Sequence, residues 1–232
     1  MEYKKVTILL LCIDRYHLTM KHIGDAMNKA GYPFELAISD NGSTDTNIFQ
    51  WCEDQSPKIY FKNGYNYGTA QSLNRMIEAN PSDFYAFLGN DIELPNNWLK
   101  DMVELAEAIP EHGVIGCDWR HIQYETKEIN GHQFWDTTNV FGDMFISQKL
   151  RNKVGKFCED YGPYGLWDSD YSIRATAAGR VNMYLKDKHS YHFGNDVGEE
   201  SAYRKMKDAS LHAAQPIFNI NRLKYANDDY FI

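Results

Sequence analysis

The chain has 232 residues, of which 43% are hydrophobic, and a formal net charge of −8. No Pro/Gly/Ser-rich or strongly charged stretch divides it, so we expect one domain with one substantial core. The negative charge argues against a broad nucleic-acid-binding face, because such a face draws most of its affinity from Lys and Arg side chains that neutralise phosphates. The net charge does not argue against a local basic pocket.

The apolar run at residues 6–13 follows two lysines and superficially resembles a signal peptide. It is short and continues directly into Asp14, Arg15 and His17, which favours a buried first strand. No segment approaches the roughly 20 apolar residues of a membrane-spanning helix, and the four cysteines lack the close spacings of zinc or redox sites. We therefore expect a cytoplasmic protein, with membrane contact only at its periphery.

Short β-rich runs alternate with helical patterns in the first half of the chain. The expected strands cover residues 6–13, 34–39, 59–61 and 84–88. The expected helices cover residues 69–78 and residues 17–30, the latter with Met20, Ile23, Met27 and Ala30 on one face. This alternation is typical of βαβ units, so we predict an α/β fold with a Rossmann-like parallel sheet. In such sheets ligands bind beyond the carboxyl ends of the strands.

The second half of the chain is less regular. Helices are expected at residues 98–108 and from about residue 167, and strand-like runs at residues 114–117, 140–147, 181–185 and 190–193. We expect these strands to extend the sheet into a central mixed sheet flanked by helices. Residues 199–214 have a helical pattern, and residues 216–232 are expected to form a tail.

A polar turn follows the second expected strand, at residues 39–45. It places two carboxylates, Asp40 and Asp45, and two hydroxyls around a glycine, a geometry suited to hydrogen-bonding a ribose or a base. The same residues also fit a simple Asn-Gly turn in which Asp45 caps the helix near Ile48. Both readings stay open.

A second polar segment, Asn66-Tyr67-Gly68 with Asn74, lies where a loop leads into a helix. Glycine there permits the close approach of backbone to a diphosphate, and a helix N-terminus favours anions. Glycines in loops before helices are also common without any ligand.

The strand expected at residues 84–88 is followed by a segment with two acidic residues, Gly89-Asn90-Asp91-Ile92-Glu93. Strand alternation places Gly89, Asp91 and Glu93 on one side if the extended conformation persists. Their oxygens could hold Mg²⁺ or Mn²⁺ against substrate phosphates. The alternative is a solvated turn.

Asp168 begins a helix after the glycine-containing loop at residues 161–165. Asp170 and Arg174 are spaced as an ordinary ion pair on a helix surface, which leaves Asp168 to act as a general base. A helix N-terminus lowers the pKa of a carboxyl, so we expect the basicity of Asp168 to depend on desolvation.

His189 and His192 are three residues apart in a strand-like segment, so they point to opposite faces and at most one is a metal ligand. A lone histidine is more often structural.

Taken in order, these segments resemble the family-two glycosyltransferases with the GT-A fold, from about residue 6 to residue 194. The stretches that carry the resemblance are SDNGSTD, NYGTAQSLN, FLGNDIELPNNWL, VFGDMFIS, VGKF, LWDSDYSIR and HSYHFG. The resemblance implies that Asp40 contacts the nucleoside, that Asp91 holds the metal, that Asp168 is the catalytic base and that His192 contacts the metal or the diphosphate.

The implied activity is inverting transfer of a sugar from a nucleoside-diphosphate sugar, with a UDP-sugar as the first choice, to an acceptor hydroxyl, with Mn²⁺ or Mg²⁺ as cofactor. The implied donor-binding residues are Cys12, Asp14, Asp40, Asn41, Asn66, Gly68, Asn74 and Asn90. The expected acceptor contacts are Asp143, Tyr164 and Trp167, with Trp119 and Trp135 as further candidates for stacking on a sugar. We divide the single domain into a nucleotide-sugar-binding half (residues 1–95), an acceptor and catalytic half (residues 96–194) and a C-terminal helix with tail (residues 195–232).

Two residues depart from the family pattern. Gly89 stands where the first Asp of the D-x-D motif would be, and Trp167 stands where an acidic residue usually precedes the base. A catalytically silent nucleotide-sugar-binding protein is therefore an alternative. A nucleotidyltransferase is less favoured, because residues 14–19 offer only Arg15 as a cation. The acceptor, which can be a glycan, a lipid-linked sugar, a protein side chain or a modified nucleobase, stays open, as does the oligomeric state.

Overall fold

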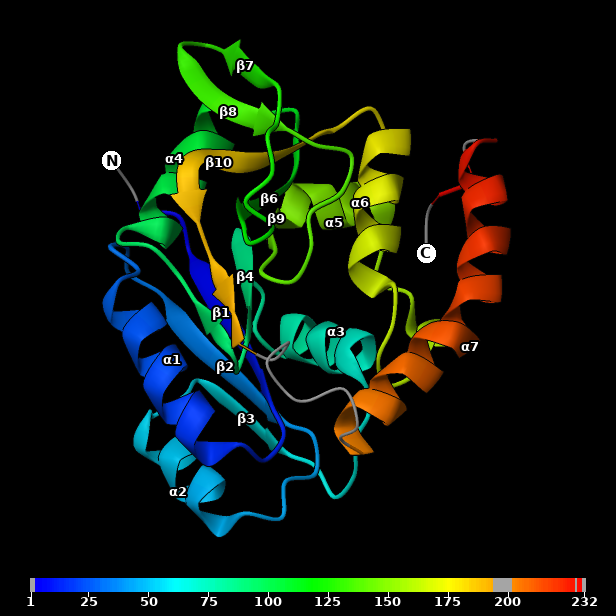
Figure 1. Ribbon diagram of the computed structural model, residues 1–232. Coiled ribbons are helices and arrows are strands. Elements are labelled where there is room, and N and C mark those ends of the chain that lie inside the picture. Colours follow the sequence, from blue (N-terminus) through cyan, green and yellow to red (C-terminus); the bar gives the residue numbers. More distant parts are fainter. Residues whose placement is uncertain (1–2, 194–201, 228, 231–232) are drawn as a thin grey trace.

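The computed structural model describes residues 3–193, 202–227 and 229–230. Its centre is a mixed sheet with the strand order β3-β2-β1-β4-β9-β6-β10-β8-β7 (Figure 1). Helices α1, α2 and α4 pack on one face of this sheet, and α3, α5, α6 and α7 pack on the other. The predicted α/β fold with a central mixed sheet flanked by helices is confirmed.

The first half of the chain forms the parallel part of the sheet. Strand β1 (Val6–Cys12) lies between β2 (Glu35–Asp40) and β4 (Phe84–Gly89) and runs parallel to both, and β3 (Ile59–Lys62) adds to β2 in parallel. The helices between the strands are α1 (Tyr16–Asn28), α2 (Thr46–Asp54) and α3 (Thr69–Ala79). Because helices cover both faces, β1 is apolar on both: Ile8 and Leu10 pack in one core cluster and Leu9 in the other.

The buried face of α1 differs from the expected one at Met20, which is 44% exposed. Thr19 and His22 are buried instead. The Nδ2 of Asn90 donates to Thr19 Oγ1 at 3.1 Å, and the ring of His22 stacks on Phe193 at a centroid distance of 4.3 Å. A prediction from hydrophobicity missed this rotation because polar residues form part of the inner face.

The second half completes the sheet. Its helices are α4 (Trp98–Ala108), α5 (Gln148–Val154), the 3₁₀ turn η1 (Glu159–Tyr161) and α6 (Trp167–Ala177). Its strands in the main sheet are β6 (His112–Asp118), β7 (Thr126–Ile129), β8 (His132–Asp136), β9 (Phe145–Ser147) and β10 (Val181–His189). A separate two-stranded sheet pairs β5 (Ile92–Glu93) with β11 (Tyr191–His192) in antiparallel orientation.

The strand expected at residues 140–147 is wrong for its first five residues, because only β9 is extended. Val140 N–H donates to Ser172 Oγ at 3.1 Å and Phe141 N–H to the Tyr184 hydroxyl at 3.2 Å, so side chains replace the partners that a strand would supply. Gly142 has a φ of 77°, which breaks the extended conformation. The segment instead places its backbone beside α6.

The C-terminal tail expected at residues 216–232 is also wrong, since α7 (Ala202–Tyr225) continues through Pro216. Pro216 is exposed, whereas Ala214, Phe218 and Tyr225 are buried against the rest of the molecule. Packing of this inner face compensates for the hydrogen bond that proline removes. Residues 199–201, where the sequence pattern begins the helix, lie outside the described residues.

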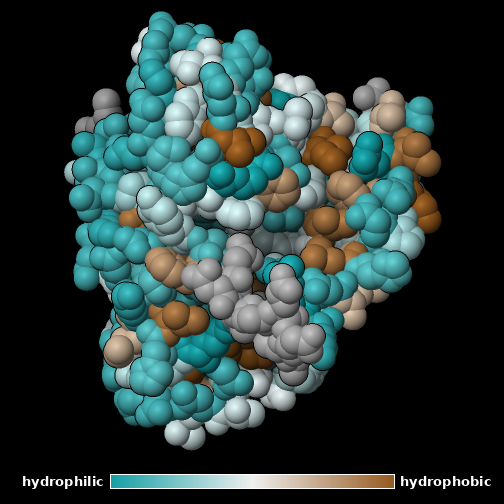
Figure 2. Space-filling view, in the orientation of Figure 1, coloured by the Kyte–Doolittle hydropathy of each residue, from teal (hydrophilic) through white to brown (hydrophobic). Residues whose placement is uncertain are grey.

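The outer side of α7 exposes two large apolar side chains near its C-terminal end. Ile220 is 59% exposed and Leu223 is 71% exposed, and Figure 2 shows apolar side chains gathered along α7. None of the helices in the described part of the chain combines the length and apolar character needed to cross a bilayer. The four cysteines are buried and form no disulfide.

Asp170 and Arg174 form a fully buried ion pair, and the expected place on a helix surface is wrong. Arg174 Nε donates to Asp170 Oδ2 at 2.8 Å, and the other oxygen of Asp170 accepts from the hydroxyls of Tyr161, at 2.6 Å, and Tyr225. Arg174 also donates to the backbone carbonyls of Val154 and Lys156. The pair therefore joins α5, η1, α6 and α7.

We expect Asp170→Ala to lower the free energy of unfolding by about 3–5 kcal/mol, because it leaves the buried guanidinium of Arg174 without its counter-charge. Asp208→Ala is a matched control, since Asp208 is the exposed i+4 partner of Arg204 on α7 and such a pair contributes only about 0.2–0.5 kcal/mol. Urea unfolding followed by circular dichroism measures both. Equal losses in the two variants would contradict the structural role given to Asp170.

Candidate functional site

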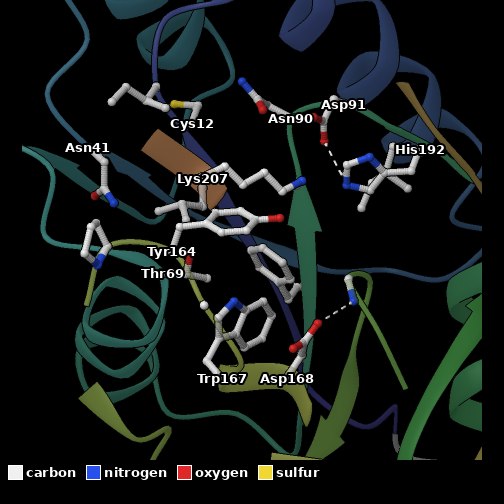
Figure 3. Close-up of a pocket in the computed structure, with 18 of the residues that line it drawn as sticks. Cys12, Asn41, Thr69, Asn90, Asp91, Tyr164, Trp167, Asp168, His192 and Lys207 are labelled. Atoms are coloured by element: carbon white, nitrogen blue, oxygen red, sulfur yellow. Dashed lines mark hydrogen bonds and ion pairs between the residues drawn. The ribbon is translucent and has the colours of Figure 1, made fainter. Parts of the chain in front are cut away.

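A cavity of about 530 Å³ lies at the carboxyl ends of β1 and β4. Parallel strands end at the same edge of a sheet, which is why polar residues that follow different strands meet there. The cavity wall is built from residues 11–15, 89–92 and 163–169, together with Met206, Lys207, Leu211 and single residues from other segments. Figure 3 shows side chains from these segments facing one another.

Of the residues predicted to bind the donor, the structure brings five together at this cavity: Cys12, Asp14, Asn41, Asn66 and Asn90. Asp40, Gly68 and Asn74 do not line it. The first group comes from the ends of β1, β2 and β4 and from the loop before α3, at the edge of the sheet where a ligand is expected.

Asn41 links the end of β2 to the start of α3. Its Nδ2 donates to Asn66 Oδ1 at 3.1 Å and to the Gly68 carbonyl at 3.3 Å, while its Oδ1 accepts from Ser72 Oγ at 2.8 Å. Asn66 Oδ1 also accepts from the Gly68 N–H at 2.8 Å. These bonds fix the N-terminus of α3 beside the cavity, where Thr69 lines the wall.

Asp14 holds the polar turn at residues 39–45 against the end of β1. Its Oδ1 accepts from the N–H groups of Thr44, at 2.7 Å, and Asp45, at 3.0 Å. Asp45 in turn accepts from Asn47 N–H at 2.9 Å and caps α2, so the capping interpretation of Asp45 is confirmed.

Asp40 is fully buried beneath the turn. One of its oxygens accepts from Ser43 N–H at 2.8 Å, and burial raises the pKa of this carboxyl. Its other oxygen has no hydrogen-bond partner among the described residues. Asp40 therefore supports the turn from behind the cavity wall.

Asn74 faces away from the cavity. Its Nδ2 donates to the Phe157 carbonyl at 2.9 Å and to Glu159 at 2.8 Å, and its Oδ1 accepts from Arg151 at 3.1 Å. Asn74 lies five positions after Thr69, which turns it about 140° from Thr69 around the axis of α3. The expected contact between Asn74 and the donor is therefore wrong. Asn74 instead holds the segment between α5 and η1 in place.

Asp91 and His192 meet at one end of the cavity because β5 pairs with β11. His192 Nε2 lies 3.6 Å from Asp91 Oδ1 (Figure 3). Arg15 Nη1 lies 3.1 Å from Asp91 Oδ2. Burial lowers the pKa of His192, which favours the neutral ring that a metal requires. Within the described residues, no group of three or more His, Cys, Asp or Glu side chains could hold a metal.

A carboxylate and a neutral imidazole that share one point fit a hard divalent cation that takes its remaining ligands from phosphates and water. Gly89 adds no carboxylate, and a Cβ at that position would lie 3.3 Å from Asp91 Oδ1. His189 lies elsewhere: its ring stacks on His121 at 4.5 Å, and its Nδ1 is 3.7 Å from Asp118. The two histidines do not converge on one point.

Asp168 lines the cavity from the first turn of α6. Its oxygens accept from the N–H groups of Ser169, at 2.7 Å, and Gly142, at 3.3 Å. Burial raises the pKa of this carboxyl to about 6, although both hydrogen bonds lower it. Burial therefore outweighs the helix N-terminus and supplies the desolvation on which the basicity of Asp168 was expected to depend.

Two of the three expected acceptor residues line the cavity, and the third does not. Tyr164 lines the cavity, and Trp167 lines it with little exposure, since its indole packs edge-on against Phe87 at a centroid distance of 5.1 Å. Asp143 is buried outside the cavity; its carboxylate accepts from Cys117 N–H at 3.2 Å, and burial raises its pKa to about 7.

The two further stacking candidates also separate. Trp119 lines the cavity, whereas Trp135 stacks on Tyr124 at a centroid distance of 5.7 Å.

Sequence reasoning missed the contribution of α7, which brings Met206, Lys207 and Leu211 to the cavity. Lys207 is half-buried, and burial lowers the pKa of its ammonium. The helical pattern around these residues was visible, but nothing local indicates which surface the helix covers.

The strand order and the position of the cavity define the GT-A class of α/β folds. The chain belongs to glycosyl transferase family 2, whose family model matches residues 18–165. No curated protein sequence matches the chain significantly.

Three solved structures share the fold at low sequence identity. GalNAc-T7 with UDP, GalNAc and Mn²⁺ is 11% identical with a TM-score of 0.66, over 82% of this chain and 44% of that one. The mannosyltransferase PcManGT from Pyrobaculum calidifontis with GDP-Man and Mn²⁺ is 17% identical with a TM-score of 0.68, over 93% of this chain and 65% of that one. S. aureus TarS 1-349 is 15% identical with a TM-score of 0.60, over 95% of this chain and 72% of that one. The chain thus spans less than two thirds of the first two proteins.

Gly68 allows α3 to approach the loop before α6 closely. Its φ is 83° and its ψ is 166°, and a Cβ there would lie 2.8 Å from the Gly162 carbonyl oxygen. We expect Gly68→Ala to lower the free energy of unfolding by about 1–3 kcal/mol, because this backbone region is open only to glycine. Gly64→Ala is the control, since no atom lies within 4 Å of its Cβ position. Thermal unfolding compares the two, and a Gly68→Ala variant as stable as Gly64→Ala would contradict the close contact.

Proposed function

We propose that the protein is an inverting glycosyltransferase that moves a sugar from a nucleoside-diphosphate sugar to an acceptor hydroxyl. The observation that carries the proposal is one cavity, at the carboxyl ends of parallel strands, that holds both Asp168 and the Asp91–His192 pair. Asp168 supplies a base, and the Asp91–His192 pair fits a cation bound to phosphates. Membership of glycosyl transferase family 2 supports the reaction class.

The donor side is argued from the polar residues at the ends of β1, β2 and β4. Asn66 and Thr69 bring the N-terminus of α3 to the cavity, and a helix N-terminus suits a diphosphate. The structures of similar fold contain UDP with Mn²⁺ in GalNAc-T7, GDP-Man with Mn²⁺ in PcManGT and UDP in TarS. These support a nucleoside-diphosphate donor, with a UDP-sugar as first choice and a GDP-sugar as second.

Asp91 and His192 are the residues that would hold Mn²⁺ or Mg²⁺. When bound, such a cation supplies electrostatic neutralisation of the negative charge that develops on the departing diphosphate. Gly89 leaves Asp91 as the single carboxylate of this motif, and Arg15 pairs with it.

Asp168 is the proposed general base. A pKa of about 6 leaves the carboxylate ionised at neutral pH and still basic enough to accept the proton of an acceptor hydroxyl. The N–H groups of Gly142 and Ser169 orient it. Attack by the hydroxyl on the anomeric carbon, with release of the nucleoside diphosphate, is a single displacement, and a single displacement inverts the anomeric configuration.

We expect Asp168→Asn to reduce sugar transfer by at least about 100-fold, because the amide cannot accept the proton. Donor affinity, measured by calorimetry, should stay within about twofold. Asp160→Asn is the control, since Asp160 is exposed in η1 on a neighbouring segment. A loss of donor binding in Asp168→Asn would make Asp168 a ligand instead of a base. A wild-type protein that binds a nucleotide sugar but releases no nucleoside diphosphate with any acceptor would favour the catalytically silent alternative.

The pH dependence follows from the same carboxyl. Because burial raises the pKa of Asp168 to about 6, the carboxylate is lost as the pH falls through that value. We expect kcat/KM to be constant above about pH 7 and to fall about tenfold per pH unit below about pH 5. Initial rates between pH 4.5 and 8, with stability checked at each pH, measure this. A rate that rises as the pH falls would rule out Asp168 as the base.

A further inference from the structure

The inner face of α7 repeats at alternating spacings of four and three residues. Its members are Lys207, Leu211, Ala214, Phe218, Asn221 and Tyr225. The last four are buried in the molecule, and the first two line the cavity. A lysine therefore occupies a position where the pattern of the helix predicts an inward-facing side chain.

Contacts along this face fix where α7 lies. Asn221 Nδ2 donates to the Tyr161 hydroxyl at 3.0 Å, and Tyr225 bonds to Asp170. About two turns nearer the cavity, a Cβ on Gly165 would lie 2.9 Å from Ala214 Cβ. Because the helix is held at these points, Lys207, seven residues before Ala214, is directed to the cavity on the same side of the helix.

Lys207 extends across the cavity towards the candidate cation site. Its Nζ lies 4.7 Å from the ring centroid of Tyr164, and Figure 3 shows its ammonium on the side of Asp91 and His192. This is a cation–π contact between the ammonium and the aromatic ring. The position suits contact with a ligand that fills the space between α3 and Asp91.

The charges at this end of the cavity favour an anion. Arg15 is paired with Asp91, and Lys207 brings a second positive charge into the same surroundings. Gly89 provides no further carboxylate to balance it. A diphosphate carries several negative charges and accepts charge-assisted hydrogen bonds from ammonium groups.

We propose that Lys207 binds the diphosphate of the donor directly, so that part of the affinity for a nucleoside diphosphate does not require a divalent cation. This inference rests on the proposed nucleotide-sugar site but adds a residue from α7, which lies beyond the segment matched by the family model. A lysine that only packs on Tyr164 would affect stability, and it would not distinguish a nucleoside diphosphate from its nucleoside.

The test measures binding of UDP and of uridine by calorimetry in EDTA, with GDP and guanosine as a parallel pair. We expect Lys207→Met to lower the affinity for the nucleoside diphosphate by about tenfold or more, since a hydrogen bond to a charged group is lost. Affinity for the nucleoside should change by less than about twofold. Lys207→Arg should keep most of the diphosphate affinity. Lys205→Met, an exposed lysine on the same helix, is the matched control.

Each other outcome overturns the inference in a recognisable way. If Lys207→Met binds UDP as the wild type does, Lys207 is not a phosphate contact, and the proposed function is untouched. If the wild type binds nucleoside diphosphates only with Mn²⁺, the cation-independent contribution is refuted. If neither diphosphate binds with or without Mn²⁺, the proposed function fails as well. Circular dichroism confirms folding, and Lys207→Gln replaces Lys207→Met if that variant unfolds.

Discussion

The parallel pairing of β1 with β2 and β4 is the constraint on which the site depends. The register aligns Cys12 with Asp40 and Leu11 with Gly89, so three strands end at one edge of the sheet. The polar residues that follow each strand are thereby brought together in space, although they are far apart along the chain. Helices on both faces allow these strands to be apolar throughout, which leaves the strand ends as the place where polar groups reach a cavity.

The part of the molecule that could be predicted from sequence is the part governed by local periodicity. The runs of apolar residues that form β1 to β4 are bounded by turn residues, and the helix Trp98–Ala108 was predicted with its observed bounds. The motifs that follow these strands sit on the expected loops, and Asp91 and His192 lie 3.6 Å apart although a long segment separates them. That convergence was inferred from a family resemblance, because no local pattern specifies it.

What could not be predicted depends on tertiary packing. Asn74 has the expected spacing from Gly68, but the rotation of α3 directs it to Arg151. Asp170 and Arg174 have the spacing of a surface pair, and only the packing of α7 over α6 buries them. The raised pKa of Asp168 has the same origin, since burial exceeds the effect of the helix terminus and the nearby N–H groups. In each case the sequence shows the residue type and the fold determines its surroundings.

The short pairing of β5 with β11 has a consequence for how ligand binding and folding are linked. These two strands have two residues each, and they join the middle of the chain to the end of β10. A ligand that bridges Asp91 and His192 therefore binds only the chain in which both halves of the main sheet are already assembled. By mass action it stabilises the whole domain against unfolding and does not merely order one loop. A ligand bound between Asp91 and His192 would thus connect the segments that follow β4 and β10, two strands that are not neighbours in the main sheet.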